Sequence, residues 1–230
     1  MLRKLFDHDI QKTKDEVLML GSMVEDAIIF SIKSLKERDF EAAHQILVDD
    51  EKINQKRFEI ENQVMTIIAT QQPMAHDLRV LASIFEIAGE LERIGDYAKG
   101  IALLCIRIGS QPLVKSLIDL PLMAELSTDM LHRALGAFVA EDLDIALAIP
   151  KEDDQVDDLY LQFYRVMMTY VMENPSNIDE ANYLLWVAHN LERLGDRATN
   201  ICERVIYMVT GERYPDPLAV DSFLFAELES

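Results

Sequence analysis

The sequence contains few of the residues that build disulfide-rich, zinc-bound or β-hairpin folds. Its 230 residues include two cysteines, Cys105 and Cys202, together with eight glycines and seven prolines. Two cysteines cannot form a disulfide framework, and no Cys/His spacing typical of a zinc site occurs. Alternating β-branched residues and hairpin turn pairs are absent, which argues against a β fold. We expect both thiols to be buried and reduced.

Positive charge is also scarce. The chain has 22 Lys and Arg against 41 Asp and Glu, which gives a formal net charge of −19. Nucleic-acid binding requires a basic surface and docking on anionic lipid requires clustered Lys and Arg, so both are excluded. This charge remains compatible with a bound cation or with a basic protein partner.

Segments that would direct the chain to a membrane are missing. No apolar run approaches the ~20 residues of a membrane-spanning helix. The N-terminal sequence MLRKLFDHDIQKTK lacks the apolar core of a signal peptide. We therefore expect a cytoplasmic protein with no direct membrane insertion. Walker loops and nucleophile elbows are also absent, so the chain is not expected to be an enzyme.

One hexapeptide occurs twice. Leu91–Asp96 is LERIGD and Leu191–Asp196 is LERLGD. A Glu and an Asp four residues apart lie on one helix face, where they repel by a few tenths of a kcal/mol. A glycine inside a helix costs ~1 kcal/mol relative to alanine. Because the sequence accepts both penalties at two matching places, the motif predicts a duplicated site. Such a site would either bind a cation or pack closely against a neighbouring segment.

The repetition extends over most of the chain. The segment that starts at Met23 aligns without gaps with the segment that starts at Leu126, 103 residues later, whereas the two hexapeptides are 100 residues apart. The second copy has therefore lost three residues, which we place near Pro73 and Pro175. This predicts two similar domains, residues 1–110 and 111–210, followed by a partly ordered tail at 211–230.

Each copy is predicted to form three long helices, which makes the fold all-α with six helices in two similar bundles. Apolar residues recur three and four positions apart, the period of an amphipathic helix, and Pro73, Pro112 and Pro175 fall between the periodic segments. The expected helices are 9–37, 40–70 and 74–108 in the first copy, and 114–139, 143–172 and 179–209 in the second.

The helical register predicts where the acidic side chains lie. If Leu191 and Leu194 take the core positions a and d, Glu192 and Asp196 take the outward positions b and f. Glu92 and Asp96 take the same positions in the first copy, and Asn200 continues the stripe of the second. The middle helices add two further pairs at positions off the core, Asp50 with Asn54 and Asp153 with Asp157.

These pairs could converge along one outer groove in each copy. Carboxylate and amide oxygens are the ligands that hard cations and iron prefer, and four carboxylates side by side would repel without a counter-charge. His189, one turn before Glu192, could add a nitrogen ligand, although a surface histidine is the simpler interpretation. A second interpretation needs no metal, because solvated helix faces commonly carry acids paired with arginines.

The two-copy layout, the segment QQPMAHDLR at Gln71–Arg79 and the two hexapeptides resemble the PhoU family over roughly Phe6–Thr210. The resemblance implies two pseudo-symmetric three-helix bundles that hold metal ions on their surface, most often iron or zinc and possibly other divalent cations. It assigns three complete Glu/Asp-x-x-x-Asp motifs, namely Glu92 with Asp96, Asp153 with Asp157, and Glu192 with Asp196. In the fourth motif Asp50 is followed by Asn54, where the family usually has Asp.

The resemblance also implies a function. PhoU proteins are not enzymes, and they couple the phosphate ABC transporter to its sensor histidine kinase. In this role they repress the phosphate-starvation response when phosphate is plentiful. A homodimer or higher homo-oligomer is expected.

Acidic side chains on long helices also occur in two other classes of protein. A di-metal oxidase needs inward-facing Glu residues and a Glu-x-x-His motif on each of two facing helices, whereas the sequence has this motif only once, at Glu41–His44. A metal-free helical scaffold that binds a basic partner through its acidic grooves remains the alternative. If metal binds, the four carboxylates of the second copy should bind it more tightly than the first copy, where Asn54 is neutral.

Overall fold

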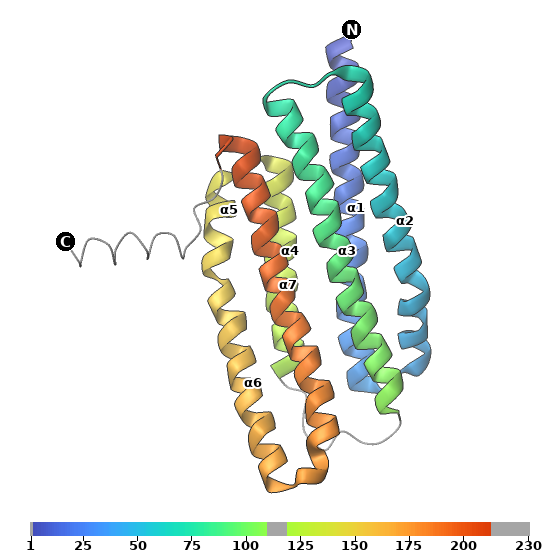
Figure 1. Cartoon of the computed structure of the whole chain (residues 1–230), viewed down its shortest axis with the longest axis vertical. Coiled ribbons are helices and arrows are strands. Elements are labelled where there is room, and N and C mark those ends of the chain that lie inside the picture. The colour runs from blue at the N-terminus through green and yellow to red at the C-terminus, as the bar shows by residue number, and fades with distance from the viewer. Residues whose placement is uncertain (1, 110–118, 213–230) are drawn as a thin grey trace, which may run out of the picture.

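The computed structural model describes residues 2–109 and 119–212, and its regular structure in these ranges is entirely helical (Figure 1). The first bundle contains α1 (Leu2–Glu37), α2 (Phe40–Gln71) and α3 (His76–Ile108). The second contains α4 (Asp119–Ala140), α5 (Leu143–Ala148), η1 (Ile149–Lys151), α6 (Asp153–Glu173), η2 (Pro175–Asn177) and α7 (Ile178–Thr210). The expected all-α fold of two three-helix bundles is confirmed. Residues 114–118 of the expected fourth helix and residues 213–230 of the expected tail lie outside the described ranges.

The middle helix of the second copy differs from the expectation of one continuous helix over 143–172. It is divided into α5, the short 3₁₀ turn η1 and α6. Pro150 lies in η1, where it has no N–H to donate to the preceding turn and its ring crowds the carbonyl four residues earlier. The prediction of an unbroken helix was therefore wrong at Pro150, and the break places Asp153 in the first turn of α6.

The turn before each middle helix has the same construction in both copies. The carboxylates of Asp39 and Asp142 cap α2 and α5 by accepting hydrogen bonds from the backbone N–H three residues later, at 2.9 and 3.1 Å. The residues just before them, Arg38 and Glu141, both have positive φ, at 62° and 55°. Capping side chains of this kind satisfy donors that a helix start leaves free. The equivalence of the two copies is therefore visible in their backbones as well as in their sequences.

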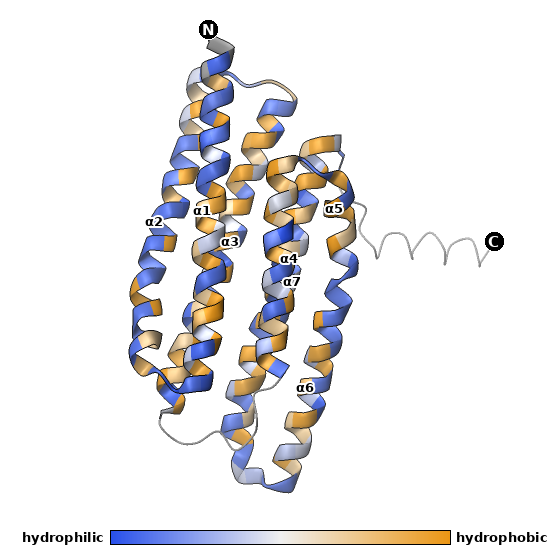
Figure 2. Ribbon diagram, turned by 180° about the vertical axis from the view of Figure 1, so that it is seen from behind, coloured by the Kyte–Doolittle hydropathy of each residue, from blue (hydrophilic) through white to orange (hydrophobic). Residues whose placement is uncertain are grey.

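The core of each bundle follows the predicted helical period. On α3 the side chains of Leu91, Ile94 and Ile101 are fully buried, as are those of their α7 counterparts. Cys105 and Cys202 are buried and free, as expected. Hydrophobic and hydrophilic residues alternate along every helix (Figure 2). Within the two described ranges, no helix is both long and apolar enough to cross a membrane.

The bundles pack side by side through α3 against α7 and α1 against α4 (Figure 1). Polar side chains join α3 to α7 along their length. Arg79 Nε and Ser83 Oγ donate hydrogen bonds to α7 carbonyl oxygens at 3.1 and 3.2 Å, and Arg204 forms an ion pair with Glu86 at 2.7 Å. At Gly100, a β-carbon would overlap the Trp186 ring. The outer acidic pairs are thus carried on two bundles held in a defined relative position.

Candidate metal centre

Four carboxylates of the second copy act on one another. Asp153 and Asp157 lie one turn apart at the start of α6, and Glu192 and Asp196 lie one turn apart on α7. Burial first, and then the negative charges of Asp157, Asp196 and Glu192, raise the pKa of Asp153 to about 7. Like charges disfavour the ionised form of a carboxyl only when they are close to it. The side chains of the two helices therefore face a common space.

Two more carboxylates of this group are perturbed in the same direction. Burial and the charge of Asp196 raise the pKa of Asp157. Burial and Asp196 also raise the pKa of Glu192, although His189 opposes this with its Nδ1 at 3.1 Å from Glu192 Oε2. The predicted convergence of the acids of α6 and α7 is thus supported by their electrostatics. His189 is half-exposed and lies beside the group rather than within it.

Oxygens of Asp153, Glu192 and Thr199 at this site are buried without a hydrogen-bond partner. Oδ1 of Asp153 has almost no exposed surface and accepts no hydrogen bond. It lies where a β-carbon on residue 195 would be, so only Gly195 leaves room for it. Oγ1 of Thr199, one turn beyond on α7, is also buried without a partner. Buried polar atoms are normally hydrogen-bonded, and an orphaned carboxylate oxygen is the kind of atom that a cation would satisfy.

The donor set of the second copy suits a divalent cation, but the side chains are not gathered into a cage. Across residues 2–109 and 119–212, no group of three or more His, Cys, Asp or Glu side chains is arranged to hold an ion. Mutual repulsion keeps such carboxylates apart, and a bound cation would supply the attraction that draws them together. Asn200 does not join the four acids, because its Nδ2 donates to Oε2 of Glu90 on α3, 3.1 Å away.

The first copy is arranged differently. Asp50 is buried, with 5% of its surface exposed, and the Nζ of Lys99 on α3 lies 2.6 Å from its Oδ2. Asn54 donates to the same oxygen at 3.2 Å. The expectation that Asp50 lies off the core was wrong. A β-carbon at Gly95 would lie 3.1 Å from Ile53 Cγ2, so α2 packs closely on α3 here. This close packing buries Asp50, the side chain expected at the outward position e of α2.

The other two predicted ligands of the first copy, Glu92 and Asp96, have different environments. Glu92 lies 3.4 Å from Nη1 of Arg57, a residue of α2, whereas Asp96 is exposed, as is Asp196 at the aligned position of the second copy. The sequence analysis missed both cations, Lys99 and Arg57. Each could have been found from the repeat alignment, because Lys99 aligns with Thr199 and Arg57 aligns with Tyr160. Both neutralising charges are therefore specific to the first copy.

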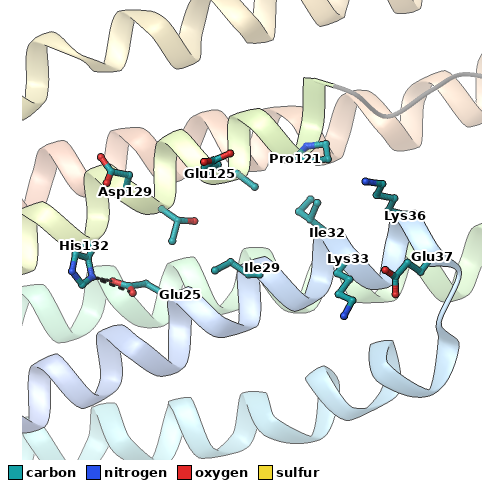
Figure 3. A pocket seen from close by; sticks show the side chains of 12 residues that line it. Glu25, Ile29, Ile32, Lys33, Lys36, Glu37, Pro121, Glu125, Asp129 and His132 are labelled. Carbon is teal, nitrogen blue, oxygen red and sulfur yellow. Dashed lines mark hydrogen bonds and ion pairs between the residues drawn. The ribbon is translucent and has the colours of Figure 1, made fainter.

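A cavity of about 540 Å³ lies between α1 and α4, where the bundles meet (Figure 3). Its lining is mixed, with apolar Ile29 beside charged side chains from both helices. An ion pair joins Glu25 to His132 at 3.3 Å across it, and burial raises the pKa of Glu25 despite that partner. None of the predicted metal ligands lines this cavity.

Comparisons with known proteins agree with this architecture. The family model described as PhoU domain matches residues 17–104 and 120–205. The chain is similar to a phosphate-specific transport system accessory protein PhoU homolog of Clostridium acetobutylicum, with 35% identity over 93% of this chain and 98% of that protein. It is also similar to the phosphate-specific transport system accessory protein PhoU of Escherichia coli, with 34% identity over 91% of this chain and 87% of that protein.

A solved structure gives the same result in three dimensions. The phosphate transport system regulatory protein PhoU from Streptococcus pneumoniae superposes with a TM-score of 0.84 and 30% identity, over 92% of this chain and all of the other. Both matches to the family model fall on the two bundles, one on each. The chain belongs to the PhoU family.

Proposed function

We propose that this protein is a regulatory accessory protein of phosphate uptake rather than an enzyme. The observation that carries the proposal is the similarity of nearly the whole chain to proteins named as accessory to the phosphate-specific transport system. It works in the cytoplasm, as a homodimer or higher homo-oligomer. There it couples the phosphate ABC transporter to the phosphate sensor histidine kinase and represses the phosphate-starvation response when phosphate is plentiful.

The second copy is proposed to hold iron, zinc or another divalent cation. Asp153 and Asp157 from α6 and Glu192 and Asp196 from α7 would bind it. Support comes from the orphaned Oδ1 of Asp153 and from the raised pKa values of three of these carboxyls. The positive charge would neutralise their repulsion and tie the two helices together, which is a structural role.

A gene-deletion experiment tests the regulatory role. In high phosphate, cells without the gene should express alkaline phosphatase or another phosphate-starvation reporter, and a plasmid copy should restore repression. In low phosphate, both strains should express the reporter equally. Unchanged repression in the deletion strain, in cells with no second copy of this family, would contradict the proposal.

Metal analysis distinguishes the metal-binding proposal from the metal-free scaffold. Protein purified without chelator should retain iron or zinc, and dialysis against a chelator should remove it. A scaffold that binds a basic partner through acidic grooves would retain no stoichiometric metal, and its partner binding would weaken with rising salt.

A further inference from the structure

The aligned positions of the two copies differ in charge where α2 meets α3 and α6 meets α7. Lys99 of the first copy corresponds to Thr199, and Asn54 corresponds to Asp157. The first copy thus gains a cation and loses a carboxylate at the same site. Both changes shift the local charge toward neutrality.

Contacts of the first copy show where the added cation lies. Nζ of Lys99 is 2.6 Å from Oδ2 of Asp50, the carboxylate that aligns with Asp153. The hydrogen bond to Asp50 raises the pKa of Lys99 in spite of burial, and the charges of Asp96 and Glu51 add to the effect. The ammonium therefore sits in the combined field of the first-copy acids. Oδ1 of Asp50 remains without a protein donor, but Asp50 also lines a cavity of about 260 Å³ that has room for water.

The four carboxylates of the second copy have different neighbours. Among the described residues, no Lys or Arg forms an ion pair with Asp153, Asp157, Glu192 or Asp196. Thr199, in the position of Lys99, brings only an uncharged hydroxyl, and its Oγ1 has no partner. The two copies therefore need different amounts of external positive charge.

We propose that Lys99 is a built-in cation that takes the place of a metal ion in the first copy, so that the chain has one metal centre and not two. The inference rests on the proposed metal centre of the second copy. It assigns the first-copy set of Asp50, Asn54, Glu92 and Asp96 to a metal-independent structural contact. An ammonium carries one charge and three donors, so it needs fewer carboxylates than a divalent ion, which agrees with Asn54 in place of Asp.

Exchanging the aligned residues tests the proposal in both directions. The variant Asn54→Asp/Lys99→Thr gives the first copy the residues of the second. After equilibrium dialysis with Zn²⁺ alone, it should bind about twice as much zinc per chain as the wild type. The converse variant, Asp157→Asn/Thr199→Lys, should lose most of its zinc. Asp157→Asn alone is its control, since the larger lysine side chain can disturb packing at residue 199.

Thermal unfolding in excess chelator provides a second readout that needs no metal. Lys99→Met leaves Asp50 buried and charged, so its melting temperature should fall by about 3–6 °C. The double variant Asp50→Asn/Lys99→Met removes the stranded charge and should recover most of that loss. Circular dichroism would follow both variants and show whether they fold.

The outcomes separate the two proposals. If the wild-type protein binds no zinc, the proposal of a metal centre in the second copy is overturned. The melting temperature of Lys99→Met in chelator would still decide the role of Lys99. A Lys99→Met variant as stable as the wild type in chelator would overturn that role. A folded Asn54→Asp/Lys99→Thr variant with unchanged zinc would also overturn it.

Discussion

The two bundles carry acidic side chains at the same helical positions but balance them in different ways. In the first copy Asp50 is buried against Lys99, and Glu92 lies near Arg57. In the second copy, burial and then the acidic neighbours raise the pKa of Asp153, and its Oδ1, like that of Asp50, accepts no hydrogen bond. A duplicated motif therefore does not guarantee a duplicated site. What surrounds the motif determines whether the acids are satisfied within the protein.

The glycines of the two hexapeptides sharpen this comparison. Gly95 allows the side chain of Ile53 to approach α3, whereas Gly195 makes room for the carboxylate of Asp153 on α7. The same small residue serves apolar packing in one copy and a polar site in the other. Close helix approach was retained in both copies, while the group that uses the space changed.

The largest difference between the copies is expected in metal affinity. Asp196→Asn should weaken Zn²⁺ binding by on the order of tenfold or more, because it removes a charged ligand from a four-carboxylate site. Asp96→Asn, at the aligned position, should change affinity little. Calorimetric titration of the two variants with Zn²⁺ would measure this. Equal losses of affinity would break the comparison.

The metal-free protein should respond to neutralisation with opposite signs in the two copies. At pH 8, Asp153→Asn removes a charge that burial and then its acidic neighbours disfavour, and it should raise the free energy of unfolding by on the order of 1–2 kcal/mol, after allowance for solvent screening. Asp50→Asn removes the ion pair with Lys99, which is 39% exposed, and should lower it by about 1 kcal/mol. Urea unfolding in chelator is the measurement, and a change of the same sign in both variants would count against the difference in charge balance.

The stability of the metal-free protein should also depend on pH through Asp153. The pKa of this carboxyl is raised from 3.8 to about 7 on folding, so the folded state binds more protons between these values. Its contribution to stability is present below about pH 4 and is lost as the pH rises through 7. The gain from Asp153→Asn should therefore shrink by on the order of 1 kcal/mol between pH 8 and pH 5. A gain that is independent of pH would show that the ionised carboxylate of Asp153 is not its cause.

The smallest expected effect concerns the glycines. Gly195→Ala should push the carboxylate of Asp153 aside and weaken Zn²⁺ binding about threefold to fivefold. The chain should remain folded, because the displaced atom ends a side chain and alanine favours the helix. In Gly95→Ala the new methyl group would press on Ile53, and zinc affinity should not change. A larger loss of zinc affinity in Gly95→Ala than in Gly195→Ala would show that the metal binds in the first copy, contrary to the proposal.

Much of the fold could be predicted because helical periodicity and repetition are local properties of the sequence. The bounds of α2 and α3 agree with the predicted helices within two residues, and the N-caps Asp39 and Asp142 lie at aligned positions. The break at Pro150 was missed, although proline inside a periodic segment is a recognised helix breaker. The pattern of apolar residues continues through it and hid the interruption.

The candidate site was predicted less completely because its charge balance depends on contacts between helices. The heptad register correctly grouped Asp153 with Asp157 but could not show that the close packing at Gly95 buries Asp50. The pairing of Lys99 with Asp50 joins residues 49 positions apart. Asn200 continued the acidic stripe in sequence, yet its amide is bonded to Glu90 across the boundary between the bundles. Such contacts follow from the packing of helices, which the period of one helix does not specify.

Anomalous diffraction at the zinc edge, from crystals grown with Zn²⁺, tests the difference between the copies most directly. Density is expected between α6 and α7, beside Asp153, Glu192 and Asp196. The region between α2 and α3 should show no anomalous density, with Lys99 still in contact with Asp50. Anomalous density beside both Asp50 and Asp153, or beside Asp50 alone, would contradict the conclusion that only the second copy is built for a metal ion.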